Sequence, residues 1–302
     1  MDIPSFMPIL GIKTRRMMNI LKSSLLVCVL SLLFVSRLFA AGIAELDGHK
    51  RVRFAECFNR PSAQFLMMAL DLPLGEIGTV PPSWATLPSE TPEDLKNLED
   101  TFVMANFDII ITGNKAYAES LRKRGLVKQP VSLWKERIIL AGPAERLAAF
   151  SGLDAASALR KIFSEKGLYF SLLADEDVIE AEGALFKSAG IENRASYRGY
   201  VETTRDDLNA LFQAGDEGAF LLVGEASFAQ YAEAERLDPA LVKIAPTDHF
   251  RHTYACLAEN AGFRKIRAAD AAKYMEWLQG ASAAGIISDF SMGGTNPFVP
   301  SR

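Results

Sequence analysis

Two groups of side chains in the sequence have residue types that could bind a metal ion. Asp248, His249 and His252 combine a carboxylate with two imidazoles, which are common ligands of zinc. The acidic run 175–177 could bind a cation. A structural role is favoured for both groups, because the first is typical of a turn before a strand and acidic residues at a helix start complement its positive end. The sequence therefore predicts neither a metal site nor a cofactor.

The signatures of the common enzyme classes are absent from the sequence. It contains no GxSxG, HExxH, CxxC, GxxxxGK[ST] or GxGxxG motif. These motifs supply the nucleophile, the metal ligands or the phosphate-binding loop of many enzymes. We therefore expect a protein that is not an enzyme.

A strand, a tight loop and a helix follow one another directly from residue 107. The largely apolar run 107–111 is closed by Thr112, Gly113 and Asn114, and a helix-like stretch begins at once. In a parallel sheet, such a loop and helix N-terminus lie at the carboxyl edge, where ligands bind. The unit predicts a ligand pocket with donors from Thr112 and Asn114. The alternative is an ordinary strand-loop-helix unit, of which every α/β protein has several.

Strands and helices are predicted to alternate along the chain, which indicates an α/β fold with largely parallel sheets. Capping residues and apolar periodicity favour helices, and β-branched or apolar runs favour strands. The segment 75–89 is rich in Pro and Gly, and it predicts little regular structure beyond a short strand near 77–80. The predicted helices are 63–70, 91–105, 154–166, 176–189, 204–212, 227–235, 270–279 and 282–290. The other predicted strands are 51–55, 134–141, 168–173, 200–202, 219–223, 241–244 and 252–258.

The composition is that of an ordinary globular protein. Hydrophobic residues make up 49% and charged residues 23% of the 302 positions. A chain of this length is typical of about two domains. Neither a disordered chain nor a polytopic membrane protein fits these values.

An apolar run at 25–35 follows Lys22 near the start of the chain. Its eleven residues are too few for a membrane span and typical of a secretory signal. We predict that residues 1–40 form a signal peptide that is cleaved after Ala40, and that the protein is periplasmic. The alternative is an uncleaved segment that anchors the protein to the membrane.

The protein without its signal peptide would be acidic. Five of the first 40 residues are basic and one is acidic, so cleavage changes the net charge from -4 to -8. No run of Lys and Arg interleaved with aromatic residues remains, which argues against a nucleic-acid partner. Cys57 and Cys256 remain, and in an oxidising compartment they permit either one disulfide or two buried free thiols.

The tail of the chain is its most distinctive part. EWL at 276–278 ends one helix-like stretch, a second stretch covers 284–290, and a Gly pair at 293–294 precedes PFVP at 297–300. This tail resembles the closing pattern of the type II periplasmic solute-binding proteins, most closely those of tungstate and molybdate ABC importers. The order of elements from residue 106 onward is similar to that family as well.

The resemblance implies a two-lobed α/β fold of the periplasmic-binding-protein type, type II, with the ligand in a central cleft. Lobe one would comprise 50–135 plus 250–302, and lobe two would comprise 136–249. The chain would cross between the lobes near Lys135 and Phe250, and the ligand would be bound by closure about these crossings.

The same division assigns both cysteines to lobe one. It therefore favours a disulfide between Cys57 and Cys256. Equal reactivity toward a thiol reagent before and after reduction would exclude that bond.

The ligand residues of the family are only partly present in this chain. The family has Thr and Ser after its first strand, an Arg with a D-S-G-T turn, and a T-D-R turn. The corresponding segments here are 55–62, 172–178 and 223–225, where two expected cations are missing and carboxylates are present. Like charges about 4 Å apart repel by a few kcal/mol at an intermediate dielectric constant, so we expect no tungstate or molybdate binding with the affinity of the family. The predicted ligand contacts at the strand ends are Asn59, Arg60, Ser62, Thr112, Gly113, Asn114, Glu176 and Glu225.

The sequence thus predicts an exported solute-binding protein, the substrate-binding component of an ABC-type importer. Its partners would be a small-molecule or ion ligand and a permease in the inner membrane, and we expect a monomer. The alternative is a diverged periplasmic interaction or accessory protein that keeps the fold without binding a small molecule.

Overall fold

The computed structural model describes residues 51–57, 61–77, 82–86, 107–173, 175–236, 238–259 and 264–301. All of these residues belong to one compact unit, His49–Arg302. The predicted signal peptide and the predicted helix over 91–105 lie outside the described residues. Within the described ranges, no helix combines the length and the apolar character that a membrane span requires.

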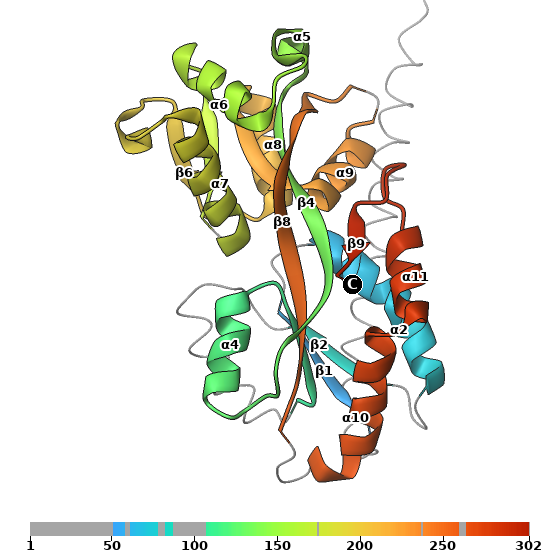
Figure 1. Cartoon of the computed structure of the whole chain (residues 1–302). Coiled ribbons are helices and arrows are strands. Elements are labelled where there is room, and N and C mark those ends of the chain that lie inside the picture. The colour runs from blue at the N-terminus through green and yellow to red at the C-terminus, as the bar shows by residue number, and fades with distance from the viewer. Residues whose placement is uncertain are drawn as a thin grey trace, which may run out of the picture. The chain divides into compact units, whose positions relative to one another are not determined.

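Strands and helices alternate along most of the described chain (Figure 1). The strands are β1 (Arg53–Cys57), β2 (Ser83–Thr86), β3 (Ile109–Thr112), β4 (Val131–Pro143), β5 (Tyr169–Leu172), β6 (Tyr200–Thr203), β7 (Phe220–Gly224), β8 (Leu241–Leu257) and β9 (Phe298–Pro300). The α-helices are α2 (Pro61–Ile77), α4 (Lys115–Lys123), α5 (Leu147–Phe150), α6 (Ala155–Ser164), α7 (Glu176–Ala189), α8 (Asp207–Glu217), α9 (Glu225–Ala234), α10 (Arg264–Leu278) and α11 (Ala281–Asp289). Short 3-10 turns cover Ala144–Arg146 and Arg194–Ser196.

The described strands form one mixed sheet in the order β2-β1-β3-β8-β4-β7-β5-β6, with β9 beside β4. β1, β2 and β3 are parallel to one another, and so are β5, β6 and β7. β8 is antiparallel to β3 and β4, and β4 is antiparallel to β7. The prediction of largely parallel sheets is therefore wrong for the centre of the sheet, where the long antiparallel pair β4–β8 joins two parallel groups that run in opposite directions.

The carboxyl ends of these two parallel groups approach the same part of β8. β3 ends at Thr112, which pairs with Tyr254 of β8. β7 ends at Gly224, which pairs with Ile138 of β4, and the preceding β4 residue Arg137 pairs with Phe250 of β8. Loops and helix N-termini that follow both groups are thereby brought to the middle of the β4–β8 pair.

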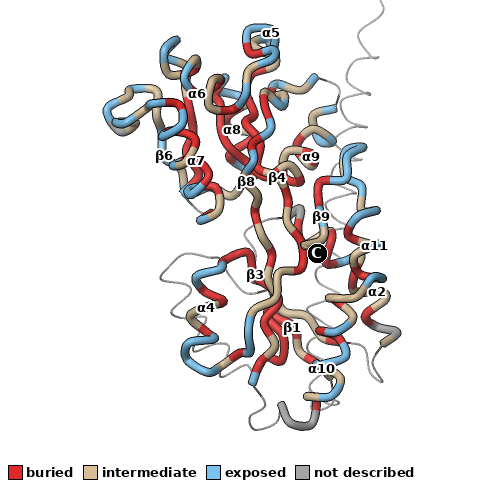
Figure 2. The backbone as a smooth tube through the Cα atoms, viewed as in Figure 1, coloured by how far each residue is buried: buried red, intermediate tan, exposed pale blue. Residues whose placement is uncertain are grey.

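The hydrophobic core consists of three clusters of buried side chains. Figure 2 marks the buried residues along the backbone. The first is formed by residues between 138 and 245 and packs α6, α7 and α8 against β4, β5 and β7. The second packs α2, α10 and α11 on the face of β3 that carries Ile109 and Ile111. The third packs α4 on the opposite face of β3, which carries Ile110. Burial on both faces explains the continuous apolar run of β3.

The strand β8 differs from its sequence-based prediction. The sequence predicts two strands, 241–244 and 252–258, whereas the structure has one strand of 17 residues. Pro246 and its neighbours are typical of a turn, but here register shifts in the pairing with β4 accommodate them. The helix predicted over 176–189 is confirmed, while β2 lies in a segment predicted to be largely irregular.

A buried carboxylate, Glu182, fastens α7 to β5 and β6. It accepts hydrogen bonds from the hydroxyls of Tyr169 (3.1 Å), Ser171 (2.9 Å) and Tyr200 (3.0 Å), and Arg194 Nη1 lies 3.4 Å away. Burial raises the pKa of the Glu182 carboxyl above its ordinary value, although these partners lower it in part. Protonation of Glu182 is thus easier in the folded protein than in the unfolded chain.

Replacement of Glu182 should change how stability depends on pH. Because the folded-state pKa is raised, the stabilisation is fully present below the ordinary pKa of 4.5 and is lost as pH rises through the folded-state value. We expect Glu182→Gln to remove this loss, so that the difference in unfolding free energy between variant and wild type shifts in favour of the variant between pH 5 and pH 8. Urea unfolding across that range measures the effect, and Glu192→Gln, at an exposed position, is the control. Parallel pH profiles of wild type and Glu182→Gln would contradict the assignment.

Candidate ligand-binding site

Strand ends and helix N-termini meet around residues 250–254 of β8. α4 follows β3, α7 follows β5 and α9 follows β7. Helix N-termini carry partial positive charge and unpaired N–H groups, and ligands of open α/β sheets bind outside the carboxyl ends of strands. Since neighbouring residues of a strand face opposite ways, β4 and β8 present two different surfaces here.

On the face that carries Trp134, the guanidinium of Arg251 is fully buried among three carboxylates. It makes a two-pronged pair with Asp207, in which Nη2 lies 2.8 Å from Oδ1 and Nη1 bonds Oδ2. Its Nε lies 3.2 Å from Oδ2 of Asp175, and its Nη1 lies 3.7 Å from Oε1 of Glu136. Burial alone would lower the pKa of Arg251, but the charges of these carboxylates outweigh burial and raise it. We call these four residues, Glu136, Asp175, Asp207 and Arg251, the Arg251 cluster.

Each carboxylate of the Arg251 cluster also occupies a helix N-terminus. Asp175 caps α7 by accepting the N–H of Val178, at 3.1 Å. Asp207 is the first residue of α8, and Glu136 accepts the N–H of Ala226 in the first turn of α9, at 2.9 Å. The helix ends stabilise the negative charges, which explains how three carboxylates are buried beside one guanidinium.

The Arg251 cluster depends on the absence of a side chain at Gly224. A Cβ atom there would lie 2.5 Å from Nη1 of Arg251 and 2.6 Å from Oε2 of Glu136. Carbon atoms do not approach polar groups so closely without a shift of one of them. Gly224 therefore lets β7 end directly against the buried charges.

The opposite face of β4 and β8 carries a different set of side chains, which we call the Phe250 strip. Its five half-buried residues are Lys135, Arg137, Phe250, His252 and Tyr254. Lys135 Nζ lies 4.4 Å and Arg137 Cζ 5.2 Å from the centre of the Phe250 ring. The rings of His252 and Tyr254 are 6.1 Å apart and inclined by 25°. Lys135 pairs with His252, and Arg137 pairs with Phe250, across the two strands.

The Phe250 strip is bordered by the N-termini of two helices. Thr112, just before α4, pairs with Tyr254, so its side chain lies on the same face of the sheet. Asp177, in the first turn of α7, accepts the N–H of His252 at 2.7 Å. Figure 1 shows both helices on the same side of the β4–β8 pair, with α2, α10 and α11 on the other side.

The two faces differ in charge balance. Arg251 has three carboxylate neighbours, whereas neither Lys135 nor Arg137 forms an ion pair with any residue that the structure describes. Arg137 donates one hydrogen bond, to the backbone carbonyl of Thr247 at 3.2 Å. The Phe250 strip thus has two partly buried cations that form no ion pair with the described residues, which is an arrangement that an anionic ligand would complete.

The predicted ligand loop 112–114 lies beside this strip. Thr112 Oγ1 accepts the N–H of Asn114 at 3.1 Å, and Asn114 Oδ1 accepts the N–H of Tyr117 at 2.7 Å, which caps α4. Gly113 is buried between them. The polar atoms of the loop serve the turn and the helix cap, and contact of these three residues with a ligand stays a prediction.

The other predicted contacts are spread more widely. Asn59 and Arg60 lie outside the described residues, and Ser62 lies in the first turn of α2. Glu176 is exposed in the first turn of α7. Glu225 begins α9 and pairs with a lysine of β8 at 2.5 Å, outside the Arg251 cluster. Their contact with a ligand also stays a prediction.

The residues weighed as metal ligands are not gathered into a metal site. Among the described residues, no group of three or more His, Cys, Asp or Glu side chains could hold a metal ion. Asp248 and His249 lie within β8 instead of in a turn, and His252 belongs to the Phe250 strip.

The predicted disulfide is not formed, because Cys256 is a buried free thiol. Ala55 of β1 and Cys256 of β8 both pair with Ile110 of the strand between them. Two strand spacings amount to about 10 Å, and Cys57 lies two residues farther along β1. A disulfide requires Cα atoms less than about 7 Å apart. Burial raises the pKa of the Cys256 thiol to about 12, so this thiol is unreactive.

The residues of the Phe250 strip and the Arg251 cluster were not predicted as a site. Lys135 and Phe250 entered only as the predicted crossings between lobes. A signal was present, since Lys135, Glu136 and Arg137 place three consecutive charges inside a predicted strand, which is unusual for a central strand.

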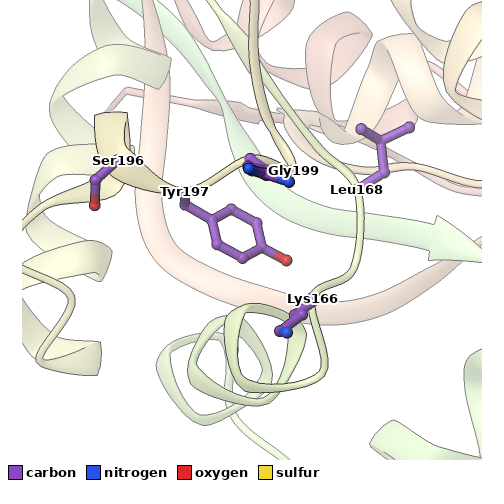
Figure 3. A pocket seen from close by; sticks show the side chains of 6 residues that line it. Lys166, Leu168, Ser196, Tyr197 and Gly199 are labelled. Atoms are coloured by element: carbon purple, nitrogen blue, oxygen red, sulfur yellow. The ribbon is translucent and has the colours of Figure 1, made fainter.

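A pocket of about 510 Å³ lies elsewhere, beside the amino ends of β5 and β6 (Figure 3). The hydroxyl of Tyr197 donates to the carbonyl of Gly167 there, at 2.9 Å. This pocket is at the end of the strands opposite to the predicted ligand loops. Its lining residues are Lys166, Leu168, Ser196, Tyr197, Arg198 and Gly199.

Disruption of the Arg251 cluster should strongly destabilise the protein. In Asp207→Asn, the new amide N–H would face the guanidinium, and the two-pronged pair would be lost. We expect a loss of about 3 kcal/mol in unfolding free energy, at the lower end for a broken buried pair because two carboxylates remain beside Arg251. Chemical denaturation measures this loss, and Asp216→Asn, at an exposed position of the same helix, is the control. Equal stabilities of the two variants would contradict a structural role of the cluster.

Solved structures of binding proteins share this fold. The tungstate-binding protein TupA of Desulfovibrio alaskensis G20 aligns with a TM-score of 0.69 and 20% identity, over 83% of this chain and 99% of that one. The tungstate ABC transporter structure from Geobacter sulfurreducens aligns with a TM-score of 0.63 and 18% identity, over 80% of this chain and 98% of that one. Iron-bound HitA of Pseudomonas aeruginosa aligns with a TM-score of 0.58 and 9% identity, over 80% of this chain and 84% of that one. At these identities the likeness shows the fold alone, which is the predicted two-lobed α/β fold of periplasmic binding proteins.

The family model of the bacterial extracellular solute-binding proteins matches residues 95–292, which is more than half of the chain. Comparison with curated proteins gives no match. The family model and the shared fold confirm the resemblance found in the sequence, and the chain belongs to the family of bacterial extracellular solute-binding proteins.

Proposed function

We propose that this protein is the exported substrate-binding component of an ABC-type importer, and that it delivers its ligand to a permease in the inner membrane. The observation that carries the proposal is the convergence of both sets of strand carboxyl ends on residues 250–254 of β8. This arrangement brings loops from both parallel groups of strands to one place, where a ligand can contact both. The family assignment supports a binding role instead of a catalytic one.

In this proposal the lobes are 50–135 plus 250–302 and 136–249, and the ligand binds by closure about β4 and β8. The distribution of the core supports the division. The first hydrophobic cluster draws only on residues between 138 and 245, and the other two draw on the remaining parts except for Ala226 of α9. Separate cores allow two lobes to move as bodies.

We further propose that the ligand is neither tungstate nor molybdate. Two of the similar structures are a tungstate-binding protein and a tungstate ABC transporter. In this chain, however, the buried cation near the N-termini of α7 and α8, Arg251, is already paired with Asp207 and Asp175. A dianion brought there would meet these carboxylates at short range in a poorly solvated place. Repulsion of a few kcal/mol would oppose its binding.

The Arg251 cluster also supports a second candidate function. Asp175 and Glu136 accept N–H groups at the N-termini of α7 and α9, and Asp207 lies in the first turn of α8, so these helix starts already carry negative charge. A protein whose anion-binding groups are satisfied internally could keep the fold as a periplasmic interaction or accessory protein. The two functions differ in whether a small molecule is bound and released.

Closure on a bound small molecule tests the first function. We expect native mass spectrometry of protein purified without unfolding to detect a bound small molecule, which unfolding and refolding would remove. Solution scattering should then give a larger radius of gyration for the refolded protein, because the lobes open without ligand. Identical masses and identical radii before and after refolding would favour the accessory role.

Direct titration tests the exclusion of the oxyanions. We expect isothermal titration calorimetry of the refolded protein to detect no binding of tungstate or molybdate with a sub-micromolar dissociation constant. The physical reason is the repulsion by Asp175 and Asp207 described above. Sub-micromolar binding of either ion would contradict the proposal, and sulfate serves as a control for nonspecific ionic effects.

A further inference from the structure

We propose that the ligand is a small aromatic monocarboxylate, held on the Phe250 strip with its carboxylate between Lys135 and Arg137. This inference rests on the proposed function, because it names the class of solute for the same site. It is drawn from the charges, the rings and the hydrogen bonds of the strip and its borders.

The first step concerns the two cations. Lys135 and Arg137 are half-buried, lie on one face of β4, and form no ion pair with the described residues. Both are held over the same ring, that of Phe250, at 4.4 and 5.2 Å from its centre. Partial burial of a cation is unfavourable in free energy unless an opposite charge lies beside it. A carboxylate between Lys135 and Arg137 would supply that charge. The position therefore favours an anion.

The second step concerns the size of the charge. Asp177 lies at the edge of the strip, where it accepts the N–H of His252. Lys135, Arg137 and Asp177 together carry a net charge of +1, and Glu176 nearby is exposed and screened by water. A monoanion neutralises this set, whereas a dianion would leave excess negative charge beside Asp177.

The third step concerns the rings. Phe250, His252 and Tyr254 alternate along β8 and therefore share one face, and the last two stack at 6.1 Å. These rings are half-buried, so part of each remains accessible to another ring, which gains by stacking or by edge contact. A small inorganic ion would leave this surface unused, so the strip suits a ligand with a planar apolar part.

The fourth step concerns the hydrogen-bond donors that a bare oxyanion would need. At α4 the N–H of Tyr117 is bonded to Asn114, and at α7 the N–H of Val178 is bonded to Asp175. Each cap thus already bonds one of the N–H groups at its helix N-terminus. Recognition on the strip thus depends more on Lys135 and Arg137 than on the helix ends.

Calorimetric titration of the refolded mature chain with matched acids and amides tests this inference. The probes are benzoate, nicotinate and phenylacetate, each with its neutral amide. We expect at least one carboxylate to bind, with at least tenfold weaker binding of the corresponding amide. If no carboxylate binds, or if an amide binds as well as its acid, the inference is wrong.

Variants then locate the site. Lys135→Gln and Arg137→Gln should each weaken binding of the carboxylate at least tenfold, and Phe250→Leu should weaken it while leaving the charges in place. Lys128→Gln, at an exposed cation just before β4, should bind as the wild type does. Lys135→Arg keeps the charge and should retain most of the affinity, which guards against loss of fold as the cause. Wild-type affinity in both Gln variants would overturn the assignment.

The experiments separate this inference from the proposed function. A bound metal ion or sugar in native mass spectrometry, with closure in scattering, would overturn the aromatic monocarboxylate and leave the binding role intact. Absence of any bound molecule, of closure and of binding by all probes would overturn both. A bound aromatic acid that Lys135→Gln no longer retains would support both.

Discussion

The burial of Arg251 is the constraint on which the centre of the structure depends. A guanidinium with no exposure is tolerated only where carboxylates surround it, and here they come from β4 and from the starts of α7 and α8. Two of these carboxylates, Asp175 and Glu136, also accept N–H groups at the starts of α7 and α9. The Arg251 cluster also ties the helices of the segment 136–249 to the long strands β4 and β8. Gly224 is the local requirement, since a side chain there would overlap the charges.

Side chains alternate between the two faces of the sheet along β4 and β8. One face therefore carries charges that stabilise the fold, and the other carries charges that are available to a ligand. Glu136 faces Arg251, while its neighbours Lys135 and Arg137 face the other way, toward Phe250. The first set is ion-paired within the chain, and the second forms no ion pair with a described carboxylate. Removal of a charge from the first set should therefore affect folding, whereas removal of a charge from the second should affect binding. This distinction follows from register alone, because a shift of one residue would exchange the two sets.

Much of the fold is readable from local signals, but the site depends on distant pairings. α7 was predictable because Asp175 caps its start and Gly190 ends it in a left-handed conformation. β8 was not, because Pro246 and the polar residues after it are typical of a turn, and only the pairing with β4 extends the strand through them. The Phe250 strip has the same origin, since its cations and rings come from strands more than 100 residues apart. The loop 112–114 was found from its local sequence, whereas the disulfide prediction failed because β3 separates the two cysteine-bearing strands.

The same contacts indicate where closure has to take place in the proposed binding cycle. Asp177 holds the backbone of His252, and Asp175 holds Arg251, so the start of α7 and this part of β8 move together. These contacts restrain residues 251–252, which follow the proposed crossing near Phe250, and the pairing of β4 and β8 has a register shift between Ser132 and Trp134, just before the proposed crossing near Lys135. The Phe250 strip lies at the boundary between the proposed lobes, and closure would bring the starts of α4 and α7 together over it. A ligand stabilises a closed state only by the contacts it gains there. We expect the loop 112–114 to supply such contacts in addition to those of the strip.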